Sequence, residues 1–274
     1  RNEIMIYYAM ALYPEAQPFI WQMNLKKRAE ETHLQIFENE ETCLVITGVG
    51  EVQAAAAVAY LLARRPPKAQ DLLVNVGVCG SERQPLGTCY LCNKIVEQTT
   101  GRTFYPDILL RHPFEEAATM TCPVVAGDGA NETALLDMEA AGIYQAGQMF
   151  LQPHQMAFLK IVSDAADGRR LSKQQVEQLV QRHAETIIAW SKQAQACLAR
   201  QQAELFSPEE EKAIEAAAAE HGLTLTQRRQ MQQLLRYDKL EQGDIGALLK
   251  ELPERMESGK QEGKQYLEQL RQHI

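Results

Sequence analysis

The sequence lacks the features that mark a membrane-spanning or a disulfide-stabilised protein. No stretch is both apolar and uncharged for the width of a bilayer, and Arg1, Asn2 and Glu3 precede a short apolar strand instead of a secretory signal pattern. The cysteines are few, irregularly spaced and mostly set in apolar segments: Cys43, Cys79, Cys89, Cys92, Cys122 and Cys197. We therefore expect reduced thiols and a cytoplasmic location.

The chain also lacks an excess of positive charge. It carries 28 lysines and arginines against 36 acidic residues, a formal net charge of -8. Because binding to a phosphate backbone requires clustered Lys and Arg, we expect no nucleic-acid partner. We expect no membrane partner either, since no apolar segment is long enough to cross a bilayer. A hydrophobic fraction of 45% over 274 residues is typical of a globular protein, with room for one large domain and a smaller appendage.

Metal-binding patterns are equally scarce. The histidines are scattered, and no HExxH pattern occurs. Cys89 and Cys92 form a lone CxxC, which we interpret as two strand cysteines because no second pair or His cluster accompanies it. The sequence therefore predicts neither a metal nor an organic cofactor.

What the chain does contain is an α/β pattern. Two apolar runs, residues 44–50 and 73–81, each enter a glycine-rich turn, and an alanine-rich helix over residues 52–62 lies between them. Several predicted strands are apolar on both faces, which indicates a sheet covered on two sides. We predict an α/β fold with a central mixed twisted sheet flanked by helices. The expected strands cover residues 4–10, 34–38, 43–48, 72–78, 87–96, 121–126 and 156–163.

From about Leu171 the strand signals stop. Ser207, Pro208 and Glu210 form an N-terminal helix signal, and Gly222 is placed to end that helix. A last polar helix is expected to start at Pro253. We therefore predict an α/β domain over residues 1–206 and a small all-helical extension over residues 207–274.

Four short motifs then place the chain near one family. They occur in order: Gly48-Val49-Gly50 before the alanine-rich helix, Asn75-Val76-Gly77-Val78-Cys79-Gly80, Asp137-Met138-Glu139-Ala140-Ala141 and Val162-Ser163-Asp164-Ala165-Ala166-Asp167. From about Ile4 to Arg200 the chain resembles the purine nucleoside phosphorylase and 5'-methylthioadenosine/S-adenosylhomocysteine nucleosidase superfamily. The resemblance implies a nucleoside phosphorylase-like fold, cleavage of an N-ribosidic bond without a cofactor, and a homodimer or higher homo-oligomer.

Cleaving that bond requires an acid over the purine and a carboxylate near the sugar. By resemblance, Asp164 matches the family aspartate that protonates the purine N7. Glu139 matches the glutamate that grips the ribose hydroxyls, and Met138 is expected against the sugar ring. Each has a structural alternative, because Ser163 and Asp164 could cap the next helix, Glu139 could favour a helix dipole and Met138 could pack in the core. The other expected substrate-binding residues are Ser163, Gly77, Val78, Cys79, Gly80 and Lys160, the last replacing a family arginine.

The general base is the least regular match. The family nucleosidases carry a water-activating glutamate just after an Ala-Met pair, and this chain has Ala9 and Met10. Glu15 fits the role only if Tyr13 and Pro14 are accommodated before it. The alternative is an ordinary solvated glutamate after a proline turn.

Three functions follow from these residues. The first is hydrolysis of a purine nucleoside, with a 5'-thio-substituted adenosine as the model substrate. The second is phosphorolysis, which Asn75 disfavours because bacterial phosphorylases of the family place an arginine there and an amide offers no charged fork to phosphate. The third is a catalytically weak nucleoside-binding or scaffold protein, because the chain is short between residues 128 and 138, where the base wall is expected.

Overall fold

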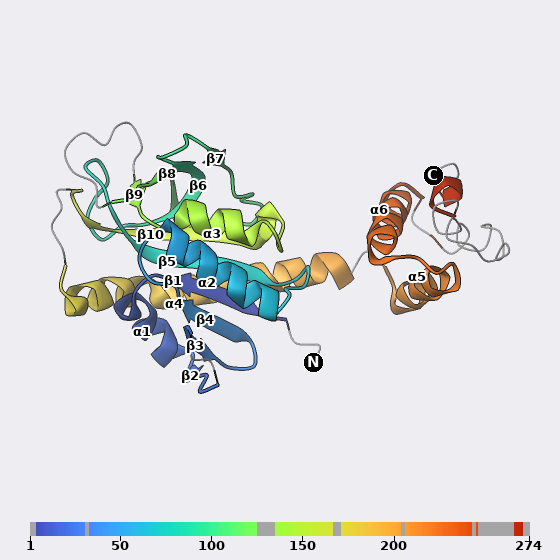
Figure 1. Cartoon of the computed structure of the whole chain (residues 1–274), viewed down its shortest axis with the longest axis horizontal. Helices are drawn as coiled ribbons and strands as arrows, with labels where there is room; N and C mark the ends of the chain where they lie inside the picture. Colours follow the sequence, from blue (N-terminus) through green and yellow to red (C-terminus); the bar gives the residue numbers. More distant parts are fainter. Residues whose placement is uncertain are drawn as a thin grey trace. The chain divides into compact units, whose positions relative to one another are not determined.

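A computed structural model of the chain describes residues 4–30, 33–124, 135–166, 171–203, 206–242, 245 and 266–270. The chain divides into two compact units, Arg1–Leu198 and Ala199–Ile274. The division falls inside the long helix α4 (Lys173–Ala203) and so precedes the boundary expected near Phe206. Figure 1 shows the elements of both units.

The larger unit is built on one mixed sheet. In chain order its strands are β1 (Ile6–Met10), β2 (Lys26–Lys27), β3 (Gln35–Glu38), β4 (Thr42–Ile46), β5 (Leu72–Gly80), β6 (Cys89–Glu97), β7 (Thr103–Phe104), β8 (Glu115–Thr121), β9 (Leu135–Asp137) and β10 (Met156–Asp164). Strand β1 lies between β4 and β5 and is parallel to both, and β10 is parallel to β5 on its other side. Strands β5, β10, β6, β8 and β9 then pair in a closed ring. The predicted α/β class with a mixed sheet is confirmed.

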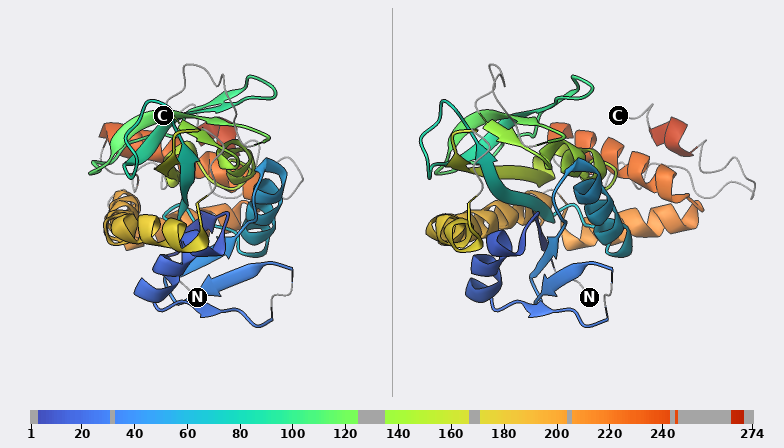
Figure 2. Two further views of the ribbon diagram at one scale, coloured as in Figure 1. Left: turned by 90° about the vertical axis from the view of Figure 1, so that its left-hand side faces the viewer. Right: turned by 60° about the vertical axis from the view of Figure 1, so that its left-hand side comes forward.

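Helices cover both faces of this sheet. One layer holds α2 (Glu51–Arg64) and α3 (Ala140–Gly147), and the other holds α1 (Tyr13–Gln22) and α4. Strand β1 shows why, because Tyr7 and Ala9 pack in the core with α2 and α3, whereas Tyr8 and Met10 pack in the core with α1 and α4. Figure 2 shows α1 and α4 on one side of the strands and α2 on the other.

The register of the parallel strands gathers their carboxyl ends at one edge. Met10 pairs with Ile46, and Asp164 pairs with Gly80 after a bulge in β10. The polypeptide leaves β1 there and begins α1 at Tyr13. Residues that follow these strands are therefore close in space although they are distant in sequence.

The described part of the smaller unit is mainly helical. It contains α5 (Pro208–Glu220), α6 (Leu225–Gln242) and a short helical segment at residues 266–270. Ser207 and Glu210 form the predicted capping box, and Gly222 follows the end of α5 with φ of 59°. A separate apolar core includes Met231 and Leu235. The helix start predicted at Pro253 lies outside the described residues.

One strand prediction was wrong. Residues 121–126 were expected to form a strand, but β8 ends at Thr121, and Cys122 to Val124 are irregular. The apolar run there contains Pro123, which cannot donate to a ladder, whereas β8 itself begins with two glutamates and has no strong strand signal. No helix in the described ranges is long and apolar enough to span a bilayer.

Candidate active site

A cavity of about 530 Å³ lies at the carboxyl ends of β1, β5 and β10. We call it the carboxyl-edge cavity. Of the expected site residues, those that line it are Glu15, Val78, Cys79, Gly80, Met138, Glu139, Ser163 and Asp164. Gly77 and Lys160 are buried and are not among its lining residues. The topology thus brings together three carboxylates, Glu15, Glu139 and Asp164, that the sequence separates widely.

Glu15 reaches this cavity because Tyr13 and Pro14 form the first turn of α1. Its side chain is 2% exposed; Oε1 accepts a hydrogen bond from the Val78 amide at 2.9 Å and Oε2 accepts one from the Leu12 amide at 2.8 Å. Burial raises the pKa of the Glu15 carboxyl, and these two amide donors oppose the rise. Glu15 is therefore a fixed, buried carboxyl group. Each of its two oxygens keeps a lone pair that these two amides do not use.

A buried ion pair lies behind the wall of the carboxyl-edge cavity. The Lys160 Nζ atom lies 2.7 Å from Asp137 Oδ2, and both side chains are almost fully buried. Burial alone favours a neutral amine, but the charges of Asp137 and Glu139 together raise the pKa of Lys160. Lys160 therefore stays charged beneath the carboxylates.

Asp137 is a residue to which the sequence analysis assigned no role. Its Oδ2 accepts the backbone amides of Glu139, at 3.1 Å, and Ala140, at 2.7 Å, and so it caps the start of α3. Its Oδ1 accepts the Thr121 hydroxyl at 2.7 Å. Two features of the sequence could have indicated this role of Asp137. It is an acidic residue two positions before Glu139, and Lys160 lies inside an apolar strand, where a buried charge requires a counter-charge.

Glu139 lies on the cavity wall at the beginning of α3. The Gly50 amide donates to its Oε1 at 3.0 Å, which ties the glutamate to the turn before α2. Burial raises the pKa of Glu139 to about 7, with Lys160 opposing and Asp137 reinforcing the rise. Near neutral pH this carboxyl therefore exchanges between its charged and neutral forms.

Asp164 ends β10 and is half-buried. Its Oδ2 lies 2.6 Å from the Ser163 hydroxyl oxygen, and its Oδ1 accepts the Ala166 amide at 2.9 Å. The same Ser163 hydroxyl lies 3.0 Å from the Cys79 carbonyl. Ser163 can donate to an ionised Asp164, or accept from a protonated one while donating to Cys79. The arrangement accommodates both protonation states of the carboxyl group.

Two of the expected glycines leave room for these carboxylates. A Cβ atom at Gly80 would come within 2.9 Å of Asp164 Oδ1 and within 3.1 Å of the Ala166 Cα. At Gly77 it would lie 3.2 Å from Glu15 Oε1. Any side chain at these positions would push against a carboxylate of the site, most severely at Gly80.

The charged side chains that line the carboxyl-edge cavity within the described residues are all acidic. The described residues that line it include Glu15, Asp137, Glu139 and Asp164 but no lysine, arginine or histidine. Apolar side chains complete the wall, among them Leu12, Val49, Val124, Leu171 and Val176. Across the described ranges no three His, Cys, Asp or Glu side chains are grouped as metal ligands would be. The cavity suits an uncharged ligand on which positive charge develops.

Solved structures share this architecture. The 5'-methylthioadenosine nucleosidase of Arabidopsis thaliana is 16% identical over 72% of this chain and 97% of that chain, with a TM-score of 0.57. The 5'-methylthioadenosine/S-adenosylhomocysteine nucleosidase of Helicobacter pylori, solved with butyl-thio-DADMe-Immucillin-A, is 11% identical over 70% of this chain and 100% of that chain, with a TM-score of 0.60. The chain has the nucleoside phosphorylase and nucleosidase fold.

The same fold also occurs in a hydrolase that is named for a different substrate. The futalosine hydrolase of Helicobacter pylori is 11% identical over 69% of this chain and 98% of that chain, with a TM-score of 0.58. One fold therefore accompanies more than one named substrate among these structures. No family model matches the chain, and no curated protein does. The likeness therefore shows the nucleosidase-like fold and does not identify a substrate.

Proposed function

We propose that this protein is a nucleosidase that hydrolyses the N-ribosidic bond of a purine nucleoside. The observation that carries the proposal is the convergence of Glu15, Glu139 and Asp164 on one cavity of about 530 Å³. Its nucleosidase-like fold is consistent with this chemistry. No metal or organic cofactor is needed for it.

In the proposed reaction Asp164 donates a proton to the purine N7, and the bond between the ribose C1' and the purine N9 breaks with its electron pair going to the base. Water attacks C1', and Glu15 takes the proton that the water loses. Glu139 accepts hydrogen bonds from the ribose hydroxyls, and the surrounding carboxylates stabilise the positive charge that grows on the sugar. The products are free base and ribose.

Water is favoured over phosphate as the nucleophile. An incoming phosphate dianion would meet four carboxylates and no cationic side chain among the described lining residues. Asn75 is buried, and its Nδ2 donates to the Ala9 carbonyl at 2.9 Å. Phosphorolysis therefore has no specific observation in its support.

The apolar wall favours an uncharged, thioether-like 5' substituent over an anionic one, so we propose a 5'-thio-substituted adenosine as the first substrate to test. Met138 is half-buried on the same wall, as a contact for the sugar ring requires. The expected base wall between residues 128 and 138 lies largely outside the described residues.

We also propose a homodimer. Val49 is 43% exposed on the cavity wall, and Val52, in the first turn of α2, is 82% exposed. An exposed valine on the cavity wall and another three residues further along the chain are suited to contact a second copy of the chain. Light scattering of the full chain in solution tests this; a monomer at all concentrations would contradict it.

The decisive experiment is release of free base from 5'-methylthioadenosine, measured by chromatography with and without phosphate. We expect release without phosphate, and loss of release by at least about 100-fold in Asp164→Asn. Asp107→Asn is the matched control, because Asp107 lies outside the cavity lining. Base release that persists in a folded Asp164→Asn variant would remove the mechanism. Saturable binding without release by the unchanged protein would favour a binding or scaffold role.

A further inference from the structure

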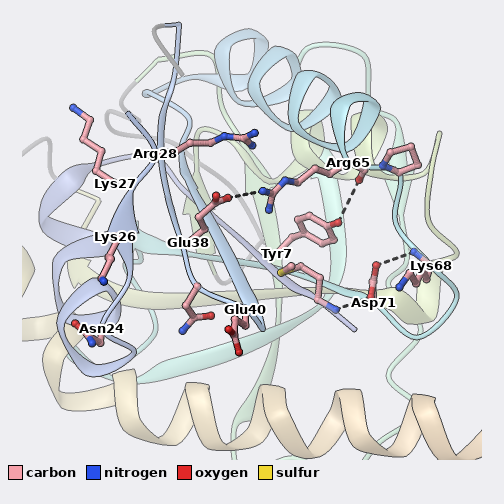
Figure 3. Close-up of a pocket in the computed structure, with 13 residues that line it drawn as sticks. Tyr7, Asn24, Lys26, Lys27, Arg28, Glu38, Glu40, Arg65, Lys68 and Asp71 are labelled. Atoms are coloured by element: carbon pink, nitrogen blue, oxygen red, sulfur yellow. Dashed lines mark hydrogen bonds and ion pairs between the residues drawn. The ribbon is translucent and has the colours of Figure 1, made fainter. Parts of the chain in front are cut away.

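A second cavity, of about 700 Å³, lies at the opposite edge of the sheet. Met5 just precedes β1 and Asp71 just precedes β5, so this cavity lies at the amino ends of the parallel strands. We call it the amino-edge cavity. Its other walls are the strand β2 with its flanking residues, the turn between β3 and β4, and the segment that follows α2. Figure 3 shows these side chains.

The amino-edge cavity is basic although the chain is acidic. Its cationic lining residues outnumber its acidic ones by five to three; they are Lys26, Lys27, Arg28, Arg65 and Lys68 against Glu38, Glu40 and Asp71. A local excess of positive charge in a chain of net charge -8 is not the average of its composition. The excess of two charges matches one phosphate dianion.

Two of the three acids already have partners. The Asp71 oxygens accept the Met5 amide at 2.7 Å and the Lys68 amide at 2.8 Å. Glu38 Oε2 lies 2.8 Å from Arg65 Nη2. These carboxylates hold the cavity walls in place, and of the three acids that line the cavity only Glu40, which is exposed, has no such contact within the described residues.

Several cations, in contrast, are uncommitted. Within the described ranges, the side chains of Lys26, Lys27 and Arg28 have no hydrogen-bond or ion-pair partner. Arg28 is half-buried, so its guanidinium group has already lost part of its hydration. A ligand that supplies acceptor oxygens would satisfy it.

Arg28 and Arg65 extend into the same corner. Burial raises the pKa of the Cys43 thiol, and the charges of Arg65 and Arg28 both oppose that rise, which places both near Cys43 on β4. In Figure 3 the two guanidinium ends point toward the same region, one from the residue after β2 and one from the end of α2. The Tyr7 hydroxyl donates to the Arg65 carbonyl at 3.2 Å and steadies that side.

From this geometry we infer that the amino-edge cavity binds a small phosphate-bearing molecule, with the Arg28 and Arg65 guanidinium groups on the phosphate oxygens. The fork of Arg28, together with the N–H donors of Arg65 that Glu38 does not occupy, fits a tetrahedral oxyanion better than a single carboxylate, which would bring one charge against a site with an excess of two. Lys26 adds charge at the rim. The site is separate from the carboxyl-edge cavity and does not depend on the proposed function.

The test is calorimetric titration of the full chain at pH 7.5 and constant ionic strength, with inorganic phosphate in one arm and adenosine monophosphate in the other. We expect saturable binding in at least one arm. Tighter binding of the monophosphate identifies an organic phosphate as the ligand, and equal binding identifies the free ion. No saturable binding in either arm overturns the inference.

Variants locate the binding. Arg28→Gln should weaken it by at least about tenfold, and Arg28→Lys should weaken it less because it keeps the charge and loses the fork. Arg64→Gln is the matched control: it removes the same charge one residue from Arg65, on an exposed side chain that does not line the cavity. Binding that is unchanged in folded Arg28→Gln and Lys26→Gln, or lost equally in Arg64→Gln, would overturn the assignment.

Discussion

The two edges of the same parallel strands have opposite character. At the carboxyl edge, backbone amides of Leu12, Val78 and Gly50 point at buried carboxylates, and the cavity is acidic. At the amino edge, guanidinium and ammonium groups surround a cavity whose acids are mostly paired. Backbone amides hold a buried carboxylate at both edges, since the Met5 and Lys68 amides donate to Asp71. The edges differ in what lines the cavity: acidic side chains backed by the buried Lys160 at the carboxyl edge, and mainly cations at the amino edge.

The comparison depends most on Lys160, the buried cation that pairs with Asp137 beneath the acidic cavity. Lys160→Met leaves Asp137 buried without its counter-charge, so we expect a loss of about 3–5 kcal/mol in the free energy of unfolding. Urea denaturation measures it. Lys192→Met, on a side chain 54% exposed, is the control and should change little. A loss in Lys160→Met no larger than that of the control would show that the ion pair does not support the cavity.

A substitution at Glu15 distinguishes a catalytic role of this residue from a role in capping α1. Glu15→Gln should reduce base release by at least about 100-fold, because an amide cannot accept the proton from water. It should also cost about 1–3 kcal/mol of stability, since its NH₂ group faces a backbone amide donor. Kinetics and denaturation are measured together, with the exposed Glu82→Gln as control. A variant that loses stability but keeps activity would restrict Glu15 to capping α1.

Glu139 makes the acidic edge sensitive to pH. Its pKa of about 7 lies above the ordinary value of 4.5, so the folded state binds a proton more tightly than the unfolded state. The stability it contributes is complete below about pH 4.5 and is lost as pH rises through 7, with a slope of at most about 1.4 kcal/mol per pH unit. Urea denaturation between pH 5 and pH 7.5 should show a smaller decline in Glu139→Gln. If stability declines with rising pH as steeply in Glu139→Gln as in the unchanged protein, the decline belongs to Glu15, because burial also raises the pKa of that carboxyl.

Much of the acidic edge could be predicted from the sequence because its residues follow predictable strands. Glu15 follows β1, residues 78–80 end β5 and Asp164 ends β10, so parallel pairing alone brings them together. Each belongs to a local motif that can be recognised without tertiary information. Glu139 was also expected from its motif, but its position beside Glu15 and Asp164 became known only from the fold, because it follows the three-residue strand β9.

The rest depends on contacts that no local pattern encodes. Strand β9 is too short for a periodic signal, and the ring that it closes joins strands distant in sequence. Lys160 was recognisable as unusual, but its partner Asp137 became known only through their 2.7 Å separation. The amino-edge cavity was not predicted at all, since Arg28 and Arg65 come from separate segments with ordinary surface charge patterns.

The smallest expected effect concerns Glu38 at the basic edge. Its ion pair with Arg65 joins side chains 26% and 29% exposed, so Glu38→Gln should change stability by less than about 1 kcal/mol. Removing this carboxylate frees the Arg65 fork and raises the local positive charge, so phosphate should bind a few-fold more tightly, by about 1 kcal/mol or less. Calorimetric titration beside Glu116→Gln, a half-exposed acid outside the cavity lining, measures the difference. Weaker phosphate binding in Glu38→Gln would mean that the carboxylate positions Arg65 for the ligand and does not compete with it. The two edges would then share one rule, in which a paired opposite charge orients the group that binds.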